Sequence, residues 1–421
     1  MFSLDKFYQI LHDNLISKIC TNNYSTYFYP FGTYEHNAQL TNSLDFSPLK
    51  VYERHDNHNL RGTKVYCYFL DQEPLNEHTP VIGNLFNCGP NSNFFLKLET
   101  EKPRLLIIVA TSEKSTLKTN MLKLKSQTVK YYDWYYFYHG FAALDWYRDL
   151  QYVEPTLFDK FTKVFICYNN LISDFRAYRL HLVANLLSQD LVKHGLVSCR
   201  LDDGVSNWKQ IAFDKECPLH INAKKKILQE FSKLKEPLAI DTDSPNGTLS
   251  ASINFHDATR ALWHVVTETV YFLPKLHLTE KIFKPIAVKR PFILVGAPGN
   301  LAYLRSYGFR TFDRWIDESY DQEQDHYVRI EKITAEIEKL CALPMSELKQ
   351  MHDEMKEVLE YNYNHFFGEF KEIIVNELVD NFEGVLMQFN NGRQPNNHSR
   401  YHQRFDFQEG YLEEVKQRLL K

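Results

Sequence analysis

Two short segments in the second half of the chain carry residues that suit a phosphorylated ligand. The apolar run Leu262–Thr267 predicts a buried strand with Glu268 at its carboxyl end. A loop follows, and Thr279 is then a favourable N-cap for a helix whose first turn contains Glu280 and Lys281. The free N–H groups and the positive dipole of that helix end suit a diphosphate, and Lys281 adds a full charge. Glu280 accepts hydrogen bonds when ionised, so it suits a vicinal diol such as that of a ribose.

Residues of this kind need a scaffold that brings strand ends together, and the apolar runs of the chain predict one. Runs of strand length occur in both halves, and helical patterns separate them. The predicted strands include Lys64–Leu70, Arg104–Ala110, Lys163–Tyr168, Leu196–Arg200, Leu262–Thr267 and Pro291–Val295. The alternation is typical of an α/β fold and predicts two doubly wound, Rossmann-like domains. Ligands of such sheets bind beyond the carboxyl ends of the strands, which favours a site in a cleft between the two domains.

The domain boundaries follow from changes of pattern along the chain. Residues 1–155 are predicted to form an N-terminal α/β domain, and Pro155 begins a plausible linker. Residues 156–375 are predicted to form a C-terminal α/β domain, whose last part is helical from His326 onward. Residues 376–421 form a tail with a final helix, which could pack back on the N-terminal domain.

The segment around Lys281 resembles the donor-binding motif of the α-1,3-fucosyltransferase family, in which an FENS-like strand end precedes a TEK-containing helix. Thr279-Glu280-Lys281 matches TEK directly, and Thr267-Glu268-Thr269 stands where the family has FEN. The loop between them is slightly longer than in the family, and the family's Asn and Ser are missing. The TEK helix, the following PFILVGAPG strand and the run Gly308–Asp321 also resemble sugar transferases encoded by bacteriophages. The resemblance covers roughly residues 164–321.

The resemblance implies a glycosyltransferase of the GT-B type, in which two Rossmann-like domains face a cleft. The C-terminal domain would bind a GDP- or UDP-linked sugar, and the N-terminal domain would bind the acceptor. The family's S-x-x-R element matches Ser173–Arg176, so Arg176 is implied to contact the donor phosphates, and Arg179 could share that role. We expect an inverting transfer by single displacement. Because cationic side chains and a helix end already balance the diphosphate, the transfer should need no metal ion and no cofactor.

The first half supplies the candidate general bases. Asp71 and Glu73 directly follow the strand-like run KVYCYFL, so their carboxylates are expected at a strand's carboxyl end. The fucosyltransferase family has an E-S-P element in a comparable place, which Glu73-Pro74 matches loosely. His139 and Asp145, in an aromatic stretch, are rivals for an acid–base or acceptor-binding role. The ordinary alternatives are a strand-end turn with capping carboxylates for Glu73 and a packing histidine for His139.

The acceptor stays open at this stage. The phage-like resemblance favours hydroxymethylated bases of viral DNA: the basic helix Lys224–Lys235 could contact a phosphate backbone, and the aromatic stretch Tyr131–Tyr147 could stack an extruded base. The fucosyltransferase-like motifs favour a glycan or a lipid-linked saccharide. A non-catalytic sugar- or nucleic-acid-binding module that kept the fold is the alternative from another class. Asp241-Thr242-Asp243 forms a DxD in a polar loop away from any predicted strand end, which makes it a weak metal-site candidate.

Composition limits the remaining possibilities. The chain has 49 basic and 53 acidic residues, a net charge of −4, so no global field attracts nucleic acid. Its seven cysteines form no CxxC pair, which argues against a disulfide framework and a cysteine-based zinc site. The N-terminus lacks the cationic start of a signal peptide, and no apolar run reaches the roughly 18 residues of a membrane span. We therefore expect a cytoplasmic protein, in the host cytoplasm if it is phage-encoded, without a membrane span and of undetermined oligomeric state.

Overall fold

The computed structural model describes residues 3–16, 24–29, 65–70, 105–109, 130–153, 160–240, 251–391 and 407–421. The chain divides into two compact units. Unit 1 comprises Met1–Asp145 with Lys371–Lys421, and unit 2 comprises Trp146–Phe370. The candidate bases Asp71 and Glu73 and the DxD at 241–243 lie outside the described residues.

Unit 1 contains a four-stranded parallel sheet whose strands neighbour one another in chain order. The strands are β1 (Tyr24–Tyr29), β2 (Val65–Leu70), β3 (Leu105–Val109) and β4 (Lys130–Trp134). The apolar sequence of β3, LLIIV, is typical of a parallel strand covered on both faces. The described helices of this unit are α1 (Leu4–Ile10), the π-helical turn η1 (Leu11–Ile16), α7 (Tyr138–Trp146), α16 (Glu369–Asn391) and α17 (Tyr411–Leu420).

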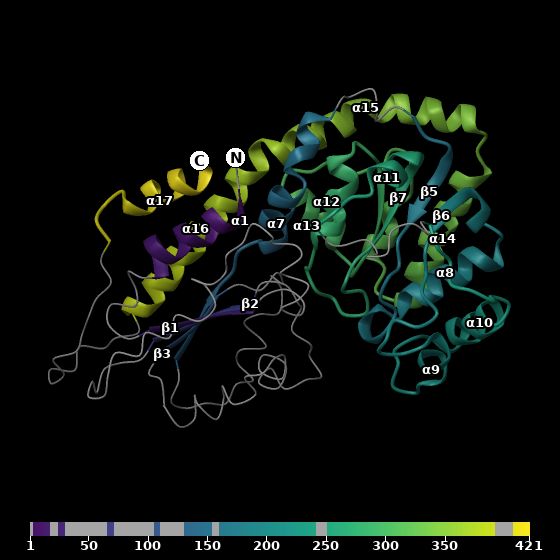
Figure 1. The fold of residues 1–421 in the computed structure, drawn as a ribbon, viewed down its shortest axis with the longest axis horizontal. Helices are drawn as coiled ribbons and strands as arrows, with labels where there is room; N and C mark the ends of the chain where they lie inside the picture. Colours follow the sequence, from purple (N-terminus) through teal and green to yellow (C-terminus); the bar gives the residue numbers. More distant parts are fainter. Residues whose placement is uncertain are drawn as a thin grey trace. The chain divides into compact units, whose positions relative to one another are not determined.

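The first helix of the chain packs on α7 within unit 1 and is hydrogen-bonded to the last helix. The Phe7 ring of α1 lies 4.3 Å from the Phe141 ring of α7 and 5.8 Å from that of Tyr136, centroid to centroid. The Tyr411 hydroxyl of α17 donates to the Asn14 carbonyl oxygen at 2.9 Å. The last helix of the chain therefore belongs to the same compact unit as the first (Figure 1).

Unit 2 contains a second four-stranded parallel sheet, in the spatial order β6-β5-β7-β8. Its strands are β5 (Lys163–Cys167), β6 (Gly195–Val197), β7 (Ala261–Thr267) and β8 (Phe292–Val295). Every residue of β7 is buried, as expected of a central parallel strand. The predicted α/β fold with parallel strands is thus confirmed.

Helices cover both faces of the unit 2 sheet, α12 and α11 on one face and α8 and α14 on the other (Figure 1). The described helices are η2 (Arg148–Tyr152), η4 (Asp174–Arg176), α8 (Tyr178–Ser188), η5 (Val192–His194), α9 (Trp208–Phe213), α10 (Ile221–Phe231), α11 (Phe255–Arg260), α12 (Glu280–Ala287), α13 (Asn300–Ser306), η6 (Glu318–Gln322), α14 (His326–Ala342) and α15 (Met345–Phe367). The Phe283 ring of α12 stacks on Phe366 of α15, with centroids 5.3 Å apart. This packing fixes the helix that carries the predicted TEK residues.

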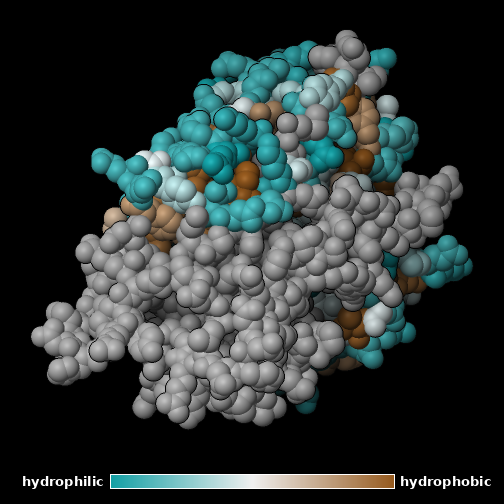
Figure 2. All heavy atoms as spheres, turned by 60° about the vertical axis from the view of Figure 1, so that its left-hand side comes forward, coloured by the Kyte–Doolittle hydropathy of each residue, from teal (hydrophilic) through white to brown (hydrophobic). Residues whose placement is uncertain are grey.

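On the face drawn in Figure 2, hydrophilic residues predominate among those coloured, and hydrophobic residues form small separate groups. None of the described helices combines the length and the apolar character that a bilayer crossing requires.

Candidate functional site at the carboxyl edge of the unit 2 sheet

The strand order of unit 2 reverses at one point. The chain leaves β5 for β6 on one side and later returns to β7 on the other side of β5. Open α/β sheets bind their ligands outside the carboxyl ends of the strands at such a reversal. The end of β7 is tied to the end of β5 here, because the Thr267 hydroxyl donates to the Tyr168 carbonyl oxygen at 2.9 Å. Glu268, the next residue, therefore stands at the switch point.

Glu268 connects the end of β7 to the start of α12. Its side chain is fully buried and accepts two hydrogen bonds from Thr279, one from the backbone N–H at 3.2 Å and one from the hydroxyl at 2.5 Å. Burial raises the pKa of Glu268, and the nearby Lys281 ammonium and the Thr279 bonds oppose that rise. A buried carboxyl group thus connects the end of β7 to the N-terminus of α12.

Helix α12 begins as the sequence predicts. Thr279 is its N-cap and has extended backbone angles, and its hydroxyl oxygen accepts from the Lys281 N–H at 3.4 Å. The first turn contains Glu280 and Lys281, while Ile282 and Phe283 are buried. The positive end of the helix therefore lies beside Glu268, at the carboxyl edge of the sheet.

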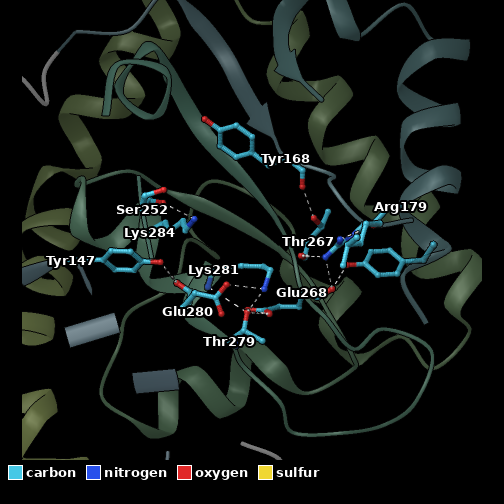
Figure 3. Close-up of polar contacts among 12 residues, drawn as sticks. Tyr147, Tyr168, Arg179, Ser252, Thr267, Glu268, Thr279, Glu280, Lys281 and Lys284 are labelled. Atoms are coloured by element: carbon cyan, nitrogen blue, oxygen red, sulfur yellow. Dashed lines mark hydrogen bonds and ion pairs between the residues drawn. The ribbon is translucent and has the colours of Figure 1, made fainter. Parts of the chain in front are cut away.

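Lys281 is the accessible member of this group (Figure 3). Its ammonium lies 3.0 Å from Glu280 Oε1 and 3.1 Å from the Thr279 hydroxyl oxygen. The Lys281 side chain keeps 31% of its surface exposed, whereas the Glu280 side chain keeps 1%. The Lys281 side chain is therefore more exposed than the Glu268 and Glu280 carboxylates.

Two further residues lie against this group that were not predicted as donor-site residues. The Tyr147 hydroxyl donates to the Glu280 carbonyl oxygen at 3.4 Å, and burial together with the Glu280 charge raises its pKa well above the usual range. Lys284 donates to the Ser252 carbonyl oxygen at 2.9 Å, and burial lowers its pKa to about 8 against the opposing effect of Glu280. The position of Lys284 one helical turn after Glu280 could have predicted its place in the site. Tyr147 ends the aromatic stretch Tyr131–Tyr147, but nothing in that stretch predicts a contact with Glu280.

The two predicted arginines occupy different environments. Arg176 ends η4, is half-buried, and has its guanidinium carbon 4.4 Å from the centroid of the Phe175 ring. Arg179 is buried, and its guanidinium donates to the carbonyl oxygens of Leu171 at 2.8 Å and Thr267 at 2.9 Å. Arg179 therefore connects the end of β7 to the loop that follows β5. Arg176 is the more accessible of the two arginines.

The loop after β5 is fixed by a carboxylate from elsewhere in unit 2. Asp203 Oδ2 accepts the backbone N–H groups of Ile172 and Ser173, both at 2.8 Å. Asp203 Oδ1 accepts those of Val205 and Ser206, both at 3.0 Å. Desolvation of Asp203 is outweighed by these hydrogen bonds, which hold its pKa well below the usual range. Asp203 thus sets the path of the chain that leads to Arg176.

The end of β8 approaches the same edge closely. A Cβ atom on Gly296 would lie 3.1 Å from Asn300 Nδ2 and 3.6 Å from the Cβ of Glu268. Asn300 is fully buried, and its Oδ1 accepts from the His277 N–H at 3.2 Å. The glycine in the VGAPG run therefore provides the space that Glu268 and Asn300 occupy.

The other predicted site residues in the described part are His139 and Asp145, both in α7 of unit 1, and Asp145 is half-buried. His139 is buried, and its ring lies edge-on to that of Tyr138 with centroids 5.3 Å apart. Within the described ranges, no group of three or more histidine, cysteine or acidic side chains is arranged to hold a metal ion. The structure thus brings Glu268, Thr279, Glu280 and Lys281 together with Arg179, while His139 lies in the other unit.

The comparisons with known proteins add no relationship to this geometry. No protein-family model, no curated protein and no solved structure matches the chain.

Proposed function

We propose that the chain is a glycosyltransferase of the GT-B type that binds its nucleotide-sugar donor at the carboxyl edge of the unit 2 sheet. The observation that carries the proposal is a coincidence of two independent features. The strand order reverses between β5 and β7, which favours a ligand at Glu268. The residues that resemble the donor motif, Thr279 to Lys281, begin α12 beside the same glutamate.

Each residue then has a distinct role in donor binding. Lys281 and Arg176 bind the diphosphate together with the N–H groups that begin α12. Once Lys281 turns to the phosphates, the Glu280 carboxylate accepts hydrogen bonds from the ribose diol. Glu268 and Arg179 position the helix start and the strand end through the bonds described above.

The proposed reaction is a single displacement. The bond between the anomeric carbon and the diphosphate oxygen breaks as the acceptor oxygen bonds to that carbon from the opposite side. A general base takes the proton of the acceptor hydroxyl, and Glu73 is the first candidate, followed by Asp71, His139 and Asp145. The negative charge that develops on the diphosphate is stabilised by Lys281, Arg176 and the helix end, so the mechanism requires no metal ion.

A thermal-shift series with GDP, UDP and their sugar conjugates tests the donor site. A nucleotide at a concentration 100 times its dissociation constant adds about 2.7 kcal/mol to the free energy of unfolding. We expect Lys281→Ala and Arg176→Ala each to weaken nucleotide binding about tenfold, because a charge-assisted bond to phosphate is lost. Lys349→Ala, an exposed lysine of α15, is the matched control and should bind like the wild type. Wild-type affinity in both site variants would refute the proposed donor site.

The acceptor is decided by a transfer assay with a mixed pool of donors. Hydroxymethylcytosine DNA, unmodified DNA and an oligosaccharide panel are the acceptors to compare. Transfer only to the modified DNA supports a DNA-modifying enzyme, and transfer only to oligosaccharides supports a fucosyltransferase-like enzyme. Nucleotide binding without transfer to any acceptor would favour the non-catalytic binding module. Activity that is lost in EDTA and restored by Mn²⁺ would contradict the metal-independent mechanism.

A further inference from the structure

One lysine of helix α12 has no role in the donor site proposed above. Lys284 lies four residues after Glu280 and three after Lys281, so the three side chains project from one face of the helix. A glutamate four residues before a lysine is the favourable order for such a pair on a helix. Lys284 is half-buried, and its ammonium donates to the Ser252 carbonyl oxygen at 2.9 Å (Figure 3). Contact with the backbone of a neighbouring segment therefore holds a positive charge one turn along from Glu280.

Donor binding would change the charges around Glu280. In the structure the Lys281 ammonium lies 3.0 Å from Glu280 Oε1, and the Glu280 side chain keeps only 1% of its surface exposed. The donor site proposed above requires Lys281 to turn from this carboxylate to the phosphates. A buried carboxylate that loses an ion pair is strongly destabilised. A second positive charge that stays near Glu280 would therefore favour donor binding.

Lys284 supplies such a charge, because its ammonium interacts with both residues. Desolvation lowers the pKa of Lys284 to about 8, while the negative charge of Glu280 opposes that decrease and the positive charge of Lys281 adds to it. Lys284 is therefore mostly protonated at pH 7, and its charge responds to the position of Lys281. When Lys281 turns away, a repulsion is removed and the attraction to Glu280 remains.

The elements packed on α12 add little charge near Lys284. Strand β7 contributes His264, which is buried and whose pKa is lowered to about 3 by desolvation, so its ring is neutral at pH 7. Strand β8 contributes the apolar sequence FILV. Helix α15 contributes Glu360, whose carboxylate pairs with the Lys289 ammonium at 2.6 Å, beyond the other end of α12. Among the described residues, the two charges of α12 named above therefore act most directly on Lys284.

We propose that Lys284 replaces Lys281 as the counter-ion of Glu280 when the donor binds. One ion pair is exchanged for another, and no covalent bond forms or breaks. Lys284 is then a positioning residue, since it acts on the donor through Glu280, whose carboxylate accepts the hydrogen bonds of the ribose diol. The inference rests on the proposed function, because phosphates must be present to attract Lys281.

A double-mutant cycle with Glu280 tests the proposal, with GDP and UDP as the ligands in titration calorimetry at pH 7. Lys284→Met should weaken binding at least about tenfold when Glu280 is present, because the buried carboxylate loses this counter-ion. In the Glu280→Gln background the same substitution should change the affinity less than about twofold, since the amide carries no charge. A Lys284 that contacts the phosphates itself, or that only supports the fold, would cost the same in both backgrounds.

The pH dependence of binding separates an effect of charge from an effect of packing. Departure of Lys281 should raise the pKa of Lys284 above its value of about 8 in the free protein. The complex then holds this proton more tightly, so the affinity should fall as the pH rises above about 8, by no more than about tenfold per pH unit. Lys284→Arg stays charged in this range, so its affinity should fall less than that of the wild type. Comparing the two proteins with the same nucleotide removes the titration of the base.

Lys349→Met, at an exposed position of α15, is the matched control and should leave the affinity and its pH dependence unchanged. Circular dichroism with thermal melting checks that each variant is folded, and Lys284→Arg keeps the test valid if Lys284→Met is not. Equal losses in the two backgrounds, or identical pH profiles for the wild type and Lys284→Arg, would overturn this inference. The donor site itself would stand in that case if Lys281→Ala still weakened binding. Absence of nucleotide binding by the wild type would overturn both proposals.

Discussion

The two sheets of the protein are both parallel, and they differ in the order of their strands and in the contacts made at the strand ends. In unit 1 the described strands follow one another in chain order, and β4 ends in Trp134, which is buried against Phe382 with ring centroids 4.7 Å apart. In unit 2 the order reverses at β5, and the strand ends lead into hydrogen bonds. The Tyr178 hydroxyl and the Arg179 guanidinium both donate to the Glu268 carbonyl oxygen.

The difference shows where this protein retains buried polar groups. A buried polar group costs free energy unless its hydrogen bonds are made. Apolar packing at the end of a strand avoids that cost. Unit 1 has such apolar packing at Trp134, the end of β4. Unit 2 instead keeps Glu268, Arg179 and Asn300 buried at the edge where its strand order reverses. Two atoms of this group, Arg179 Nε and Asn300 Nδ2, are buried without a hydrogen-bond partner among the described residues. Substitutions in the two units can test this division.

The largest effect on stability is expected from Trp134→Ala in unit 1. Loss of a buried tryptophan should lower the free energy of unfolding by about 3–5 kcal/mol, and it also removes the bond from the indole N–H to the Leu378 carbonyl oxygen. The stabilisation that a bound nucleotide adds should be the same as in the wild type. Denaturant unfolding with and without nucleotide measures both quantities. If Trp134→Ala weakens nucleotide binding as much as Lys281→Ala does, the two regions do not differ as described.

An intermediate effect is expected from Arg179→Met in unit 2. The substitution removes charged hydrogen bonds to the carbonyl oxygens of Leu171 and Thr267, so the free energy of unfolding should fall by about 3 kcal/mol. Arg176→Met is the internal comparison. Because the Arg176 side chain is only half-buried, its replacement should lower the free energy of unfolding by less than about 1 kcal/mol. Urea unfolding of the two variants side by side gives the answer. Equal costs would mean that the edge does not depend on the buried arginine.

The smallest effect is a pH dependence that Glu268 contributes. Because burial raises its pKa in the folded state, the native protein binds this proton more tightly than the unfolded chain does. The contribution is therefore present at acid pH and is lost as the pH rises from the ordinary value of 4.5 through the raised folded value. Glu268→Gln cannot ionise, so its stability deficit relative to the wild type should shrink as the pH rises.

Unfolding measured at several pH values for the wild type and Glu268→Gln checks this trend. Glu347→Gln, at an exposed position of α15, is the matched control. A deficit of Glu268→Gln that grows with pH would show that the glutamate is stabilised as a carboxylate. In that case the interactions of the Glu268 carboxylate with Lys281 and Thr279 would outweigh the effect of burial on its pKa.

The strands that could be predicted from the sequence are those with continuous apolar runs. The run in Ala261–Thr267 is of this kind, because a central parallel strand is covered on both faces. The strands Tyr24–Tyr29 and Lys130–Trp134 were not predicted, since YSTYFY and KYYDW mix aromatic and polar residues without such a run. The helical region predicted after His326 is divided at Pro344 and Gly368, where a proline and a glycine end the pattern.

The sequence by itself determined the local part of the candidate site. Glu268 at a strand end and Thr279 before a helix follow from residue types and spacing, and the structure begins α12 as predicted. The proposed ligand-binding roles of Arg176, Glu280 and Lys281 remain predictions, and Asp71 and Glu73 lie outside the described residues.

Only the tertiary structure decided which of these groups are buried and what they bind. It buried Glu268 and Glu280, turned Arg179 into the sheet edge, and brought the Tyr147 hydroxyl to a carbonyl oxygen 133 residues away in the sequence. Spacing along a chain fixes which side chains share a strand end or a helix turn. Desolvation and the choice of hydrogen-bond partner depend on segments that the topology brings together, and no local pattern records them.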